Sequence, residues 1–151
     1  SDPKTLVRYL VDYVSSLYKG QVLETILQDV LDTPVSPELL PQEDDKIVQK
    51  TEDIVGPYEL HDFFIYHMVR FGDEPRKLYK KTKLAFKDKY DKDTIKKWLR
   101  LFYWRFFSQQ FKRSCIPDGP KVGSVALSPR GDWRMPSDAN VQIWLDEVER
   151  I

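Results

Sequence analysis

The chain has 151 residues with 24 basic and 24 acidic side chains, so its formal net charge is zero, and 41% of its residues are hydrophobic. A chain of this length and apolar content favours one folded domain with a real core over a disordered segment. Its single cysteine excludes an internal disulfide framework, and no apolar run approaches the roughly 20 residues that span a bilayer. We therefore expect a soluble, cytoplasmic protein with no membrane partner.

The first third of the chain predicts two amphipathic helices and then a long loop. Apolar residues recur at spacings of three and four over residues 3–18 and again over residues 22–30, with Gly20 between the two patterns. Three prolines between residues 34 and 41 introduce a polar stretch. A loop of this length in a compact domain is usually functional or mobile, which is our expectation for residues 34–55.

The next two predicted helices have clear boundaries. One runs over residues 58–71 and is ended by Gly72, and another begins at Pro75 and continues to about Lys87. Glycine favours the end of a helix and proline its first turn, so both boundaries have a physical reason.

The last third predicts the longest helix, an irregular stretch and a final helix. The longest helix is predicted to start at an Asp93 cap and to run to about residue 111, and the final one to follow a Ser137 cap. Only residues 122–127 suggest a strand, so the chain is predicted to be mainly α. The long helix carries a broad aromatic face, which comprises Ile95, Trp98, Leu99, Phe102, Tyr103, Phe106 and Phe107.

The two halves of the chain differ in charge. Residues 24–62 hold eleven acids and two bases, whereas residues 70–113 hold fifteen bases and five acids. The basic half, with its interleaved aromatic residues, leaves open a non-catalytic nucleic-acid-binding module. Lysine-rich surface helices would give the same composition, and a purely structural dimerisation module is a further alternative.

Three motifs follow the aromatic helix. They are Phe-Lys-Arg at 111–113, Pro-Asp-Gly-Pro-Lys at 117–121 and Ser-Pro-Arg-Gly-Asp-Trp-Arg at 128–134. Glycine and proline fix the backbone of such a segment, while lysine and arginine offer directed donors. The motifs therefore predict an ordered loop that presents positive charge.

These motifs, with the stretches at 31–39 and 55–63, resemble the C-terminal end of the glutamine-dependent NAD synthetases. In that family a glutaminase domain precedes an α/β ATP-pyrophosphatase (adenine nucleotide alpha hydrolase-like) domain. The resemblance implies that residues 1–151 are the mainly α, C-terminal helical part of that synthetase domain, with residues 34–55 as a mobile substrate loop. It also implies that the glutaminase domain and the glycine-rich ATP phosphate-binding loop are absent, so we expect the chain alone to be inactive.

The resemblance further implies a reaction and its partners. The family uses ATP and Mg²⁺ to adenylate deamido-NAD, and ammonia derived from glutamine then displaces AMP to give NAD. The expected partners are deamido-NAD, ATP, the remainder of the same polypeptide and a second copy in a homo-oligomer, and no nucleic acid is expected.

For the dinucleotide, the resemblance implies contacts from Phe111, Lys112 and Arg113. Lys112 would supply charge to the pyrophosphate or to the adenylated intermediate. Small relatives carry histidine where this chain has Phe111, which leaves that residue an apolar or stacking role. Alternatively, a Lys-Arg pair at the end of a helix only offsets the helix dipole.

For ATP and magnesium, the resemblance implies Ser36 and Glu52. A hydroxyl can donate to phosphate oxygens and ligate a hard cation, although Ser36 could equally cap a helix. Glu52 would help hold the metal or recognise the nicotinate end, and is otherwise solvated. His61 and His67 are six residues apart and do not share a helix face, so we predict no metal site there.

The role of the last motif stays open. Arg130 and Arg134 could pair with carboxylates across an interface, or form an internal staple with Asp132 and Asp138.

Overall fold

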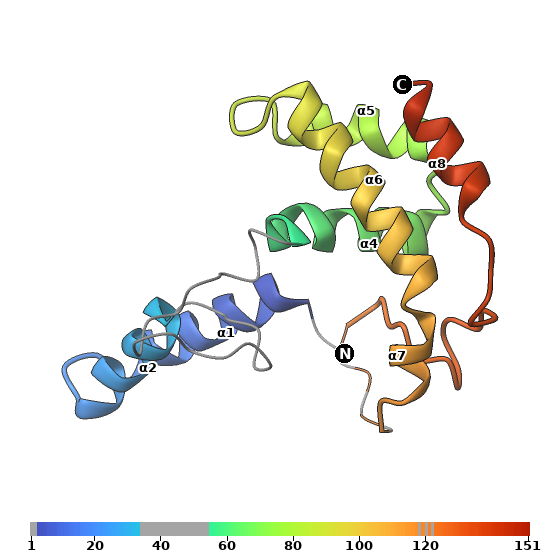
Figure 1. Cartoon of the computed structure of the whole chain (residues 1–151). Helices are drawn as coiled ribbons and strands as arrows, with labels where there is room; N and C mark the ends of the chain where they lie inside the picture. The colour runs from blue at the N-terminus through green and yellow to red at the C-terminus, as the bar shows by residue number, and fades with distance from the viewer. Residues whose placement is uncertain (1–2, 34–54, 118, 120, 122) are drawn as a thin grey trace, which may run out of the picture. The chain divides into compact units, whose positions relative to one another are not determined.

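The structure is a computed structural model that describes residues 3–33, 55–117, 119, 121 and 123–151. The chain forms two compact units, Asp2–Tyr58 and Glu59–Ile151, shown in Figure 1. The described residues form helices and no strand, which confirms the prediction of a mainly α chain.

The unit Asp2–Tyr58 contains a helical hairpin. Helices α1 (Lys4–Leu17) and α2 (Val22–Asp32) match the two predicted helices. The turn uses Gly20 at a φ of 79°, and the Gly20 N–H donates to the Glu24 carboxylate at 2.6 Å. Buried Ser15 accepts a hydrogen bond from Gln28 Nε2 at 3.0 Å across the hairpin.

Most of the large apolar side chains of this hairpin are exposed within the structure. They include Tyr9, Leu10, Tyr13, Leu17, Val22, Ile26 and Val30. A pair of helices this short gains little stability from propensity alone and normally relies on tertiary burial of its apolar face.

The unit Glu59–Ile151 contains five helices within its described residues. They are α4 (Tyr58–Phe71, whose first residue belongs to the other unit), α5 (Pro75–Ala85), α6 (Lys92–Ser108), α7 (Gln110–Ser114) and α8 (Gln142–Glu149). Helix α4 has the predicted bounds. It ends at Gly72, which takes a φ of 65° and donates its N–H to the Met68 carbonyl, as in a left-handed helix cap.

Helix α6 forms the centre of this unit, and α5 and α8 both pack against it (Figure 1). Its predicted aromatic face is buried and lies against rings from other elements. Phe102 lies 5.3 Å from Phe64 of α4, and Phe107 lies 4.6 Å from Trp144 of α8, between ring centroids. The buried members of the face are Ile95, Leu99, Phe102, Tyr103, Phe106 and Phe107.

The predicted start and end of the longest helix were wrong. The N-cap is Asp91 and not Asp93, because the Asp91 carboxylate accepts the Thr94 N–H at 2.8 Å. That backbone hydrogen bond and a second one from the Thr94 hydroxyl lower the pKa of Asp91. The helix ends at Ser108, since Gln109 leaves helical geometry and the chain restarts as α7.

The predicted start of the final helix was also wrong. Helix α8 begins at Gln142, and its first N–H donates to the Asn140 side chain at 2.7 Å. Ser137 lies in a turn five residues earlier. Residues 123–127 form no strand, and Val122 lies outside the described residues.

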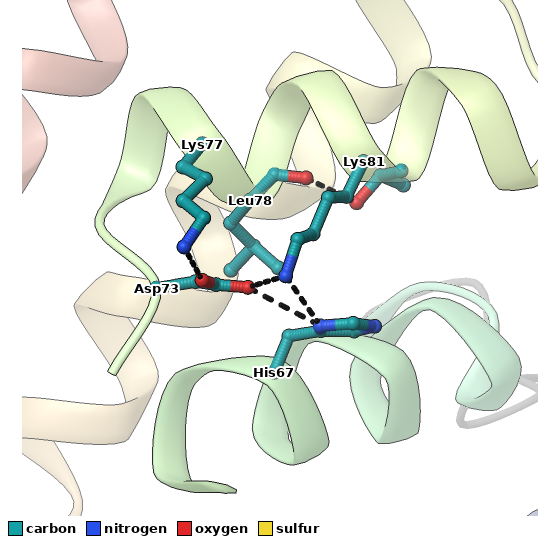
Figure 2. Close-up of polar contacts among 6 residues, drawn as sticks. His67, Asp73, Lys77, Leu78 and Lys81 are labelled. Carbon is teal, nitrogen blue, oxygen red and sulfur yellow. Dashed lines mark hydrogen bonds and ion pairs between the residues drawn. The ribbon is translucent and has the colours of Figure 1, made fainter. Parts of the chain in front are cut away.

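Asp73 forms a buried polar centre between α4 and α5, shown in Figure 2. Its side chain is 0% exposed and contacts Lys77 Nζ at 2.7 Å, Lys81 Nζ, and His67 Nδ1 at 3.2 Å. Burial alone would raise the pKa of Asp73, but the hydrogen bonds from Lys77 and Lys81 outweigh it, so this pKa lies below its usual value.

We predict that Asp73→Asn lowers the free energy of unfolding by about 1–3 kcal/mol at neutral pH, because the buried negative charge that pairs with Lys77 and Lys81 is lost. Since folding lowers the pKa of Asp73, its stabilisation is complete above the unfolded value of about 3.9 and is lost as pH falls through the folded value. Urea unfolding followed by circular dichroism from pH 7 to pH 3 measures this. The exposed Asp88→Asn is the matched control, and an equal loss in both variants at pH 7 would contradict the prediction.

Candidate functional site

The Phe-Lys-Arg motif lies on α7, a helix of five residues just beyond α6. The two helices are separated at Gln109, which has a φ of −107° and a ψ of 22°. The Gln109 carbonyl accepts the Lys112 N–H at 3.1 Å, and the Gln109 N–H donates to the Arg105 carbonyl at 3.0 Å. This break gives the motif a direction that a continuous helix would not have.

Phe111 and Lys112 point outward from this junction. Phe111 is 52% exposed, an unusual state for a phenylalanine beside an aromatic core. Lys112 is exposed, and its ammonium contacts the Gln109 side chain at 3.4 Å within the same segment. Neither side chain is used to hold the core, so both are available to a ligand.

Arg113 points inward and is half-buried. Its Nε donates to Gln110 Oε1 at 2.7 Å, one of its terminal nitrogens donates to the Phe106 carbonyl, and its guanidinium lies 4.4 Å from the Phe106 ring centroid. Burial lowers the pKa of Arg113, although a guanidinium remains charged at neutral pH. Arg113 therefore contacts the last turn of α6 and the core, and Lys112 does not.

Gln110 and Trp133 complete the junction and were not among the predicted site residues. Gln110 is 0% exposed, and its Nε2 has no partner among the described residues. Trp133 packs its ring 5.3 Å from that of Phe106 at 74°. A signal was present for Gln110, since it lies four residues after Phe106 and seven after Tyr103, on the buried helical face.

The Ser-Pro-Arg-Gly-Asp-Trp-Arg motif forms a tight turn. The Ser128 carbonyl accepts the N–H groups of Gly131, Asp132 and Trp133 at 3.3, 3.1 and 2.9 Å. Lys121 pairs with Asp132 at 2.5 Å and so links the Pro-Asp-Gly-Pro-Lys motif to this turn. The Arg134 side chain donates to the Arg130 carbonyl at 3.1 Å, within the same turn.

The other residues singled out in the sequence fall into two groups. Ser36 and Glu52 lie outside the described residues. His61 packs on Phe102, and His67 contacts Asp73, so both histidines have structural contacts. Across the described positions, no group of three or more His, Cys, Asp or Glu side chains is placed to hold a metal ion.

The basic half of the chain was the basis for the nucleic-acid-binding alternative, which needs exposed rings. Phe102, Tyr103, Phe106 and Phe107 of α6 are in the core instead, whereas Trp104 of the same helix is 45% exposed. None of the described helices has the length and apolar character needed to cross a membrane.

Comparisons with known proteins give a clear set of relatives. No family model matches the chain. Over 98% of its length it is 44% identical to the glutamine-dependent NAD(+) synthetase of Mycobacterium leprae (strain TN). It is 40% identical, over the same share, to those of Mycobacterium bovis and Mycobacterium tuberculosis. The chain spans only about a quarter of these relatives, 25% and 24% of their lengths.

We predict that two substitutions in α7 differ in their effect on stability. Gln110→Ala removes a buried acceptor of Arg113 and should cost about 1–3 kcal/mol of unfolding free energy. Lys112→Ala removes an exposed side chain and should stay within about 0.5 kcal/mol of the parent. Urea denaturation measures both, and a cost for Lys112→Ala as large as that for Gln110→Ala would show that Lys112 holds the fold.

Proposed function

Since the chain is homologous to one segment of the glutamine-dependent NAD(+) synthetases, we propose that it is part of an ATP-dependent ligase that amidates deamido-NAD to NAD. The ammonia would come from glutamine. Because the chain spans about a quarter of its relatives, the proposed activity belongs to the longer protein, and the isolated chain is expected to be inactive.

The reaction must bring two polyanions together. Adenylation joins the nicotinate carboxylate to the α-phosphate of ATP and releases pyrophosphate, and ammonia then displaces AMP from the mixed anhydride. Positioned cations lower the barrier to such a step because they are already oriented when negative charge develops. A lysine supplies such a charge on a flexible stem.

Lys112 is the residue we propose for this role, at the pyrophosphate of deamido-NAD or at the adenylated intermediate. The observation that carries the proposal is its exposed ammonium on a short helix anchored to the core. No carboxylate among the described residues forms an ion pair with Lys112, so its charge is available to an anionic ligand. The adjacent Phe111 ring is proposed to give the dinucleotide an apolar contact.

Ser36 and Glu52 remain proposed contacts to ATP and magnesium on the resemblance alone. The described residues do not themselves supply a metal site, so no step of this proposal is assigned to magnesium. The exposed apolar residues of the α1–α2 hairpin support a larger assembly with the remainder of the polypeptide, for which we also propose a homo-oligomer.

We predict that Lys112→Ala in the full-length synthetase lowers kcat/KM for deamido-NAD about 10–100-fold. This corresponds to the loss of one charged hydrogen bond, of about 1.5–3 kcal/mol. NAD formation should be measured with free ammonia and with glutamine, and the loss should appear with both donors. Lys87→Ala, another exposed lysine of the basic half, is the control. Full activity of Lys112→Ala would contradict the proposal.

A further inference from the structure

We propose that Arg113 is a positioning residue that acts through Lys112. Its guanidinium ties α7 to the last turn of α6 and thereby sets the direction in which Lys112 is presented. This inference rests on the proposed function, because Arg113 would contribute to dinucleotide binding only through Lys112 and without contacting the ligand itself.

The first support is that the Arg113 side chain bridges the helix break. One terminal nitrogen donates to the carbonyl of Phe106, which lies in the last turn of α6. The last four carbonyls of a helix lack partners inside the helix. The bond from Arg113 therefore gives one carbonyl of α6 a donor and also holds α7 against α6. The break at Gln109 lies between the two bonded residues.

The second support is the contact between the Arg113 guanidinium and the aromatic core. Phe106 is 5% exposed, and its ring contacts both the Arg113 guanidinium at 4.4 Å and the Trp133 ring at 5.3 Å. A planar guanidinium stacks on an aromatic face in a way that an ammonium does not. The position of Arg113 is therefore fixed by the core and by the turn at residues 128–133.

The third support is the dependence of α7 on these contacts. A helix of five residues is not stable through its own hydrogen bonds. Gln110 at its start is fully buried and accepts from Arg113 Nε at 2.7 Å, which fixes both ends of the segment. Lys112 lies between these two residues, so its backbone is held from both sides.

The charge of Arg113 can be separated from its geometry. Among the described residues no carboxylate pairs with Arg113, so its contacts are to a carbonyl, an amide oxygen and a ring. Arg113→Lys keeps the positive charge and loses the planar fork that reaches two acceptors at once. A purely electrostatic role would survive this change, whereas a positioning role would not.

The test is a double-mutant cycle in the full-length synthetase with Arg113→Lys, Lys112→Ala and the pair. Arg113→Lys is expected to raise KM for deamido-NAD about tenfold, but by less than about twofold when Lys112 is already alanine, because the two act as one unit. Arg100→Lys, whose arginine pairs with Glu149 at 2.6 Å on the surface, is the matched control and should leave KM unchanged. Independent, multiplying effects of Arg113→Lys and Lys112→Ala would overturn the proposal.

Hydrogen exchange in the same full-length proteins separates failure of this inference from failure of the proposed function. Arg113→Lys should speed exchange of the Lys112 amide, which bonds to the Gln109 carbonyl. An unchanged exchange rate at the Lys112 amide would overturn the positioning role of Arg113, whatever the kinetics show. If instead Lys112→Ala leaves kcat/KM for deamido-NAD unchanged, the proposed function of Lys112 is wrong, and the positioning role is overturned with it even if Arg113 holds α7.

Discussion

Burial of one face of α6 determines the arrangement of the unit Glu59–Ile151. The aromatic and aliphatic side chains of that face contact α4, α8 and the turn that carries Trp133. Each fully buried side chain of this size contributes about 1.5–3 kcal/mol, so the combined burial outweighs any single polar contact nearby. The buried face extends past the end of the helix to Gln110. Lys112 follows two residues later, and its position is therefore a consequence of the core.

The fold could be predicted where a helical pattern and a terminating residue agreed. Helix α4 is such a case, because its apolar spacing ends at Gly72, which takes the left-handed conformation that favours glycine. The caps could not be predicted in the same way. Asp91 and Asp93 are equally good cap residues by type, and the choice depends on where the first helical turn begins, since a cap accepts the N–H two or three residues later; here the Asp91 carboxylate accepts that of Thr94. The residue at which the helix begins is a property of the backbone, and it cannot be predicted from two aspartates two positions apart.

The candidate site could be predicted only in part for a related reason. The position of Phe-Lys-Arg after an aromatic helix could be predicted, but the different environments of Lys112 and Arg113 could not. Both are cations, and successive residues of a helix point about 100° apart, so the exact position of the break at Gln109 decides which one faces the core. Gln110, which is buried and accepts a hydrogen bond from Arg113, is likewise of a residue type that usually lies on the surface. Resemblance to known synthetases implied one role for the whole motif, whereas the geometry gives its lysine an exposed position and its arginine an inward-facing one.

We propose that α7 presents Lys112 to the dinucleotide, so bound deamido-NAD should shield the Lys112 ammonium from a lysine-labelling reagent. The full-length synthetase would be acetylated briefly with and without saturating deamido-NAD, and labelling at each lysine would be measured by mass spectrometry. Lys112 is exposed without ligand, so we expect strong labelling that falls several-fold when deamido-NAD binds, while exposed Lys87 is labelled equally in both samples. Equal labelling of Lys112 with and without bound deamido-NAD would show that the dinucleotide does not cover Lys112.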